Sequence, residues 1–116
     1  MKYLLDTCAL LRWLNGDLQI ASQVIEELNS SSNEVYVSSA SIWEVRIKQQ
    51  IGKLKLNANL SEVITSLSFK PLSINFLHAD KVADLPMIHK DPFDRILIAQ
   101  CLVEGMTIVT SDDIIG

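Results

Sequence analysis

The sequence predicts an α/β fold, a three-layer sandwich in which a central, mostly parallel sheet lies between helices. Short apolar segments alternate along the chain with longer segments of helical periodicity. Right-handed crossovers place such helices on both faces of a parallel sheet. With 116 residues, 48% of them hydrophobic and 21% charged, the chain has the size and composition of an ordered globular protein. We therefore expect residues 1–116 to form a single domain.

The first third of the chain predicts two strands separated by two helices. Residues 2–5 are an apolar run, and residues 7–14 have a helical composition that ends before an Asn-Gly pair. Residues 19–28 form an amphipathic helical pattern, closed by a polar loop at 29–33. The β-branched and aromatic residues at 35–37 favour a second strand.

The middle of the chain continues the alternation of helix and strand. Residues 38–50 return to a helical pattern, which Gly52 ends. A shorter helix is expected at 60–67, and the residues at 71–74 favour a third strand.

The last third predicts two more helices and the final strand. A helical pattern runs over 76–85, up to Pro86. Residues 92–104 form a long apolar helix with a glycine, Gly105, at its C-terminal cap, and residues 107–110 favour a fourth strand.

Four acidic residues occur where an α/β fold places its active groups. Such groups gather at the carboxyl ends of parallel strands, at the point where the strand order reverses. Asp6 follows the first strand directly, and Asp112 follows the fourth. Glu44 and Asp94 lie in the first turns of helices entered from that edge or near it. The placement fits one shared site.

Each acid also has an ordinary structural interpretation. Asp6 can cap the helix that follows it, and Asp112 or its neighbour Asp113 can cap whatever follows the last strand. The surrounding segments are strongly apolar, however, and an apolar helix is usually buried. Buried carboxylates that converge at one sheet edge need a compensating charge, and a metal ion supplies it.

The other two acids can likewise be explained without a metal. Glu44 has capping-box spacing from Ser41 and ion-pair spacing from Lys48. Asp91 before a proline is a strong N-cap, which puts Asp94 near the positive end of the helix dipole.

The donor types indicate which metal fits. All four candidate ligands are oxygen donors, which select hard cations such as Mg²⁺ or Mn²⁺. The histidines, His78 and His89, lack ligand spacing and are interpreted as surface or outer-sphere residues. The cysteines, Cys8 and Cys101, are expected to be buried free thiols.

The charge of the chain limits how it can bind nucleic acid. A formal net charge of −4 argues against a broad basic face, because that mode of binding needs clustered Lys and Arg. Metal ions held by the acids would then have to offset the phosphate charge. No apolar run has the roughly 18 residues that a membrane span needs, so a cytoplasmic protein without a membrane partner is expected.

Several short motifs carry a resemblance to a known family. They are Leu5-Asp6-Thr7, Ser41-Ile42-Trp43-Glu44-Val45 with Lys48, Gly52-Lys53-Leu54, Leu85-Pro86, His89, the block at 91–100, and Val109-Thr110-Ser111-Asp112. Together they span the whole chain and resemble the PIN-domain toxins of VapC type. One departure is Cys8, which stands where a His is common in that family.

The resemblance implies both an activity and its residues. By position, Asp6, Glu44, Asp94 and Asp112 match the family's metal-binding and catalytic acids, with Asp113 as an alternative to Asp112. It implies a Mg²⁺- or Mn²⁺-dependent RNA endonuclease that forms a homodimer. It further implies a cognate antitoxin whose C-terminal segment occupies the active-site groove.

Expected roles follow from this assignment. Asp6 and Asp94 would be direct ligands, Glu44 would orient the metal or the attacking water, and Asp112 would complete this site or a second one. Lys48 and Arg95 would hold carboxylates or substrate phosphates. The alternative is that both residues form ion pairs only.

Other classes of function are possible for a small α/β domain. A phosphoacceptor signalling domain needs an Asp after the third strand, where this chain has Ser73-Ile74-Asn75. A dinucleotide-binding fold needs a glycine cluster after the first strand, and none is present. A PIN-like module that has lost catalysis and only binds a protein remains the main alternative.

Overall fold

A computed structural model describes residues 1–14, 33–54, 60, 62, 69–86 and 91–110. Its centre is a sheet of four strands, β1 (Lys2–Leu5), β2 (Glu34–Ser38), β3 (Lys70–Leu72) and β4 (Thr107–Val109). The strand order is β3-β2-β1-β4, and all three strand pairs are parallel. The predicted α/β class with a parallel central sheet is therefore confirmed.

The strands are short and apolar because both faces of the sheet are covered. Parallel sheets are buried on both sides, so their strands are near-continuous apolar runs and do not alternate with polar residues. Leu4 and Leu5 are neighbours in β1 that point to opposite faces, and both are fully buried. Burial of each such side chain contributes about 2 kcal/mol. Pro71, which cannot donate to a ladder, lies in the edge strand β3.

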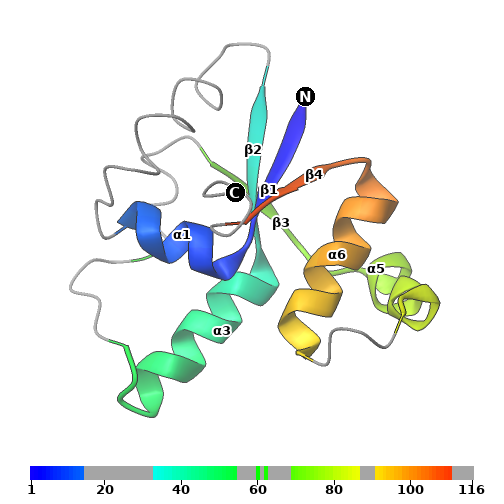
Figure 1. Cartoon of the computed structure of the whole chain (residues 1–116). Coiled ribbons are helices and arrows are strands. Elements are labelled where there is room, and N and C mark those ends of the chain that lie inside the picture. The colour runs from blue at the N-terminus through cyan, green and yellow to red at the C-terminus, as the bar shows by residue number, and fades with distance from the viewer. Residues whose placement is uncertain (15–32, 55–59, 61, 63–68, 87–90, 111–116) are drawn as a thin grey trace.

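Helix α1 (Thr7–Leu14) covers one face of the sheet, as Figure 1 shows. The core on this side combines residues from β1, α1, β2 and α3 with two more from the segment before β3. Its buried members are Leu5, Ala9, Leu10, Val35, Val37, Val45, Leu60 and Phe69.

Helix α6 (Pro92–Glu104) covers the opposite face. Its buried core consists of Leu4, Ala40, Leu97 and Cys101. Helix α3 (Ser39–Gln50) contributes Ala40 to this core and Val45 to the other, so it lies across the sheet edge and packs against both α1 and α6. The three layers are thus α1, the sheet and α6.

A short helix, α5 (Phe76–Lys81), and a 3₁₀ turn, η1 (Val82–Asp84), pack on the outer side of α6 (Figure 1). The sequence predicted one helix over 76–85, and the structure divides it into these two parts. His78 was expected at the surface or near a metal, which is wrong, because its side chain is fully buried. Its Nε2 lies 2.7 Å from Glu104 Oε2 of α6, and its Nδ1 accepts the Asn75 backbone N–H at 3.1 Å.

Most of the predicted boundaries agree with the structure to within a residue or two. The helix expected over 92–104 has those bounds, with Gly105 in the left-handed conformation at φ +68°. Ser38, expected as the first residue of a helix, is the last residue of β2 and the N-cap of α3. The helix expected over 19–28 lies outside the described residues, as does most of the one expected over 60–67.

The strand order reverses at β1, and this positions the candidate site. From β1 the chain passes to β2 and then β3 on one side, and it later crosses the sheet to reach β4 on the other side of β1. The carboxyl ends of β1 and β4 therefore border the switch point at which α/β folds bind ligands. In the part of the chain that the structure describes, no helix has the length and apolarity to cross a membrane.

Candidate active site

Asp6 lies at the switch point, between the end of β1 and the start of α1. Its backbone N–H donates to the Val109 carbonyl of β4 at 3.0 Å. Its Oδ1 accepts the Ala9 N–H at 2.7 Å, so the residue caps α1 as the simpler interpretation expected.

Glu44 lies in the second turn of α3, one turn later than the sequence indicated. Its Oε2 forms an ion pair with Lys48 Nζ at 3.1 Å, which confirms the i,i+4 pair. The Glu44 side chain is 12% exposed, and its other oxygen, Oε1, is buried without a hydrogen-bond partner. The hydrogen bond that Lys48 donates to Glu44 raises the pKa of Lys48, so this lysine stays charged near neutral pH.

The capping-box interpretation of Glu44 is wrong. The N-cap of α3 is Ser38, whose Oγ accepts the Ala40 N–H at 3.0 Å, so Glu44 is too far along the helix to complete a box. Ser41 instead accepts a hydrogen bond from the Thr7 hydroxyl at 3.2 Å, and both side chains are buried. This bond ties the start of α1 to α3. Sequence reasoning missed it, although Thr7 follows the candidate Asp6 directly.

Asp91 and Asp94 occupy the start of α6. Asp91 is the N-cap, with Oδ1 accepting the Phe93 N–H at 2.8 Å, and Pro92 begins the helix, as predicted. Asp94 is in the first turn but is exposed, which contradicts the expectation of a helix buried all round. The helix packs on the sheet with one side only, so apolar residues on its other side, such as Leu102, remain exposed.

Asp6, Glu44 and Asp94 act electrostatically on one side chain, Cys8. The pKa of the Cys8 thiol is raised, and partial burial of the thiol is the largest cause. The charges of the three carboxylates raise this pKa further, and the charge of Lys48 lowers it. Coulombic interactions fall off with distance, so three acids from three different segments lie around the same thiol.

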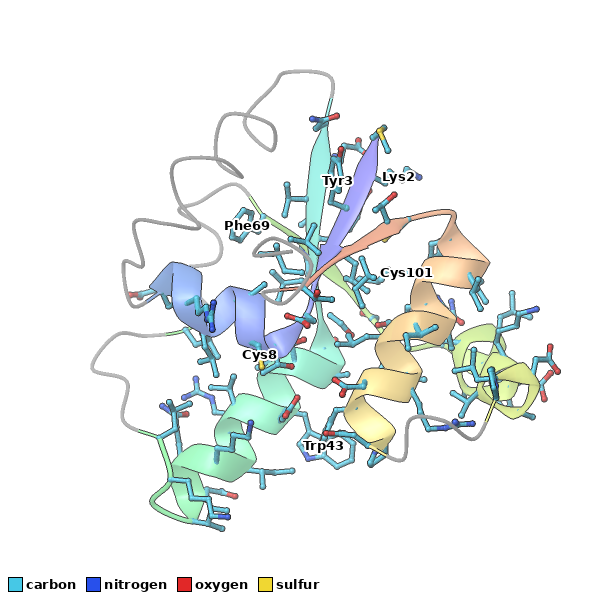
Figure 2. The ribbon with its side chains drawn as sticks, viewed as in Figure 1. Lys2, Tyr3, Cys8, Trp43, Phe69 and Cys101 are labelled. Carbon is cyan, nitrogen blue, oxygen red and sulfur yellow. The ribbon has the colours of Figure 1, made fainter. Side chains whose placement is uncertain are left out.

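Figure 2 shows Cys8 at the N-terminal end of α1, beside α3. Its expected burial was wrong, because Cys8 is exposed, whereas Cys101 is buried as expected. Burial raises the pKa of Cys101 to about 11. Neither thiol is in a disulfide, in agreement with the prediction of free thiols.

The three described acids come near one another without forming a closed ligand set. Among the described residues, no three His, Cys, Asp or Glu side chains are arranged as a metal site. The fourth predicted acid, Asp112, lies outside the described residues. The same is true of its alternative Asp113 and of His89.

Arg95 joins two segments of the chain through backbone carbonyls. Its guanidinium donates to the backbone carbonyls of Val82 at 3.0 Å and Pro86 at 2.9 Å. These bonds hold the chain after α5 against the start of α6. Lys48 is the basic residue that contacts a candidate acid directly.

Comparisons with known proteins bear on the fold and on the family. No curated protein matches the sequence. Among solved structures, a chain in the crystal structure of VapBC2 from Rickettsia felis, bound to a DNA fragment from their promoter, superposes with a TM-score of 0.76 at 17% identity. That match covers 95% of this chain and 86% of the other, and at this identity it shows a shared fold.

The family is established by sequence over almost the whole chain. The model of the PIN domain matches residues 3–115, which include β1, α3, α6 and β4 with the acids at their ends. Its range agrees with the span of the motifs described above. The chain therefore belongs to the PIN-domain family.

Proposed function

We propose that this protein is a Mg²⁺- or Mn²⁺-dependent endoribonuclease and the toxin of a toxin–antitoxin pair. The observation that carries the proposal is the convergence of Asp6, Glu44 and Asp94 around Cys8, at the switch point of a PIN-domain sheet. PIN domains are nucleases in general, so a hydrolase is the activity expected of the family.

The donors of the site fit a hard divalent cation. They are all carboxylates, and Glu44 Oε1 is a buried oxygen that lacks a hydrogen-bond partner. A buried unpaired acceptor costs about 1–3 kcal/mol, and a cation removes that penalty.

Each residue then has a role in phosphodiester hydrolysis. Asp6 and Asp94 would hold the cation, with Asp6 anchored by the strand bond to Val109. Glu44 would orient the attacking water with Oε1 while Lys48 holds Oε2 in place. Asp112 would complete the ligand set. A bound Mg²⁺ or Mn²⁺ would polarise a phosphoryl oxygen and lower the pKa of water.

The partners form part of the same proposal. VapBC2 of Rickettsia felis is bound to promoter DNA in the matching structure. We propose that this chain binds a cognate antitoxin at the surface beside the acids and forms a homodimer in the cytoplasm.

Incubation of the purified protein with labelled RNA tests the activity. We expect cleavage with Mg²⁺ or Mn²⁺ and none with EDTA, and Asp94→Asn should abolish it. Absence of cleavage by the wild type with either metal would contradict the nuclease proposal.

The alternative is a PIN-like module that binds a protein and has no activity. Exposed apolar side chains on α5 favour it, with Phe76 93% and Leu77 66% exposed. This alternative predicts stable protein binding together with no metal response in a thermal melt, whereas the nuclease predicts metal-dependent stabilisation.

A further inference from the structure

An exposed tryptophan stands beside the candidate site. Trp43 lies in α3 directly before Glu44, and its side chain is 61% exposed. Large aromatic side chains are usually well buried in a monomer, so this exposure needs an explanation. Figure 2 shows the ring between α3 and α6.

Trp43 is held in place by a second aromatic residue. The Phe93 ring packs edge-on against it, with centroids 5.2 Å apart and an interplanar angle of 77°. Phe93 is half-buried against the core beneath α6 and lies directly before Asp94. The edge contact restricts the indole but leaves most of its surface exposed.

The two rings therefore flank the acids on both helices. Trp43 directly precedes Glu44 in α3, and Phe93 directly precedes Asp94 in α6. A phosphate bound to a divalent cation on these acids would bring the base of the same or the next nucleotide close to the exposed indole.

We propose that Trp43 stacks on an unpaired nucleobase next to the phosphate that is cleaved, and so positions single-stranded RNA in the site. This inference rests on the proposed ribonuclease function. Trp43 is a positioning residue for the substrate, and the acids remain the groups that act on the phosphate.

The charge of the protein gives stacking a large share in any binding of RNA. With 14 acidic and 10 basic residues, the chain cannot gain much affinity for RNA from phosphate contacts. Stacking on an aromatic ring does not depend on net charge, and single-stranded RNA offers its bases for it. Arg46, one turn along the exposed side of α3, adds a cation near the same path.

Steady-state cleavage of a labelled, random-sequence single-stranded RNA separates this role from catalysis. Trp43→Ala should raise KM roughly 5- to 150-fold, the range expected for loss of one stacked base, with kcat and Mg²⁺-induced stabilisation little changed. Trp43→Phe should recover much of the loss. Ile51→Ala is the matched control, because Ile51 directly follows the same helix and is 59% exposed. An unchanged KM in Trp43→Ala, with an active wild type, would overturn the inference.

A binding titration tests Trp43 even if no RNA is cleaved. We expect the same RNA to quench tryptophan fluorescence in the wild type more than in Trp43→Phe, because the difference reports Trp43 alone. Equal quenching in both proteins would overturn the inference and would point to a protein as the occupant of this surface. Quenching without cleavage would instead contradict the nuclease activity while supporting the stacking.

Discussion

Asp91 and Asp94 are two acids of the same motif, and their side chains have different roles. Asp91 caps α6 through a hydrogen bond to a backbone N–H, and this bond needs an acceptor oxygen but no negative charge. Asp94 is in the first turn of the helix, and it is one of the acids that raise the pKa of Cys8. Substitution by Asn distinguishes a cap from a ligand, because Asn is also a good cap.

Asp94→Asn should change the metal response of the protein. We expect a slightly higher melting temperature without metal, because one repelling charge is removed from the acid group. Saturating Mg²⁺ at about 100 times its Kd should stabilise the wild type by about 2.7 kcal/mol and the variant by none. RNA cleavage should fall at least about 100-fold. Thermal melts with Mg²⁺ and with EDTA measure the first two effects.

Asp91→Asn is the matched control for this experiment. It removes the same charge from the same helix and keeps the cap, so the Mg²⁺ response should survive. A normal metal response in Asp94→Asn would show that Asp94 is not a ligand.

Cys8 is a natural reporter of charge in the candidate site. Burial and the nearby carboxylates raise the pKa of its thiol, which lowers the fraction of reactive thiolate. A cation bound by those acids would offset their charge, so we expect Mg²⁺ to speed alkylation of Cys8 by iodoacetamide at constant pH. Mass spectrometry of the modified peptide gives the rate.

Cys101 provides the internal control for this measurement. It is buried and its pKa is about 11, so it should react slowly with or without Mg²⁺. If the rate at Cys8 is the same with Mg²⁺ and with EDTA, no cation binds near the three acids.

At the scale of elements, α6 and β4 depend on one glycine between them. Gly105 adopts φ +68°, and its N–H donates to the Cys101 carbonyl. A Cβ at this position would meet no atom within 4 Å, so replacement carries a conformational penalty and no clash. This turn sends the chain from α6 into β4, whose carboxyl end borders the site.

Gly105→Ala should destabilise the fold by about 1 kcal/mol, because alanine disfavours the left-handed conformation. The melting temperature should fall by roughly 4 °C. Gly105→Asn should lose less, since Asn tolerates this conformation. Equal stability of Gly105→Ala and the wild type in urea denaturation would refute this explanation of the turn.

The edge of the sheet carries a pH-dependent ion pair. Lys70 of β3 forms an ion pair with Glu34 of β2 at 2.8 Å, and this hydrogen bond, with one from Tyr36, lowers the pKa of Glu34. A carboxyl with a lowered pKa in the folded state stabilises the fold above its unfolded pKa of 4.5, and the contribution is lost as the pH falls through the folded value.

Lys70→Met should therefore reduce stability at neutral pH by a small amount, since the pair is exposed, and the difference in stability should be smaller at an acidic pH below the unfolded pKa of 4.5. Urea denaturation at the two pH values measures it. In an NMR titration of the variant, the pKa of Glu34 should rise toward its ordinary value. If the difference in stability between the wild type and Lys70→Met is the same at both pH values, the ion pair with Glu34 does not make stability depend on pH.

At the scale of the whole molecule, several large apolar side chains of the described residues are exposed. Three of them lie at the start of α5 or just before it, and they are Ile74, Phe76 and Leu77. Trp43, near the candidate site, is a fourth. Protein–protein contacts commonly use such patches.

We expect the protein to be a homodimer. Light scattering at micromolar concentration should give twice the 13.0 kDa mass of one chain. If α5 forms the contact, Phe76→Ser together with Leu77→Ser should give the monomer mass while the far-UV spectrum stays unchanged. A monomeric wild type would remove the dimer prediction.

The sequence by itself determined the layered fold, because apolar periodicity and helix stop signals are local. The alternation of segments predicted the parallel sheet, and Asp91-Pro92 with Gly105 defined both ends of α6. Sequence motifs also identified the family and the candidate acids.

Only the tertiary structure decided how exposed those acids are and what they contact. Asp94 is exposed because α6 packs on the sheet from one side, a fact that the all-round apolar pattern of the helix conceals. Three contacts join residues that lie in different elements and far apart in the sequence. They are the Thr7–Ser41 hydrogen bond, the His78–Glu104 pair and the Trp43–Phe93 ring contact. Periodicity reports which face of one element is apolar, and it contains no information on which side chain of another element meets that face.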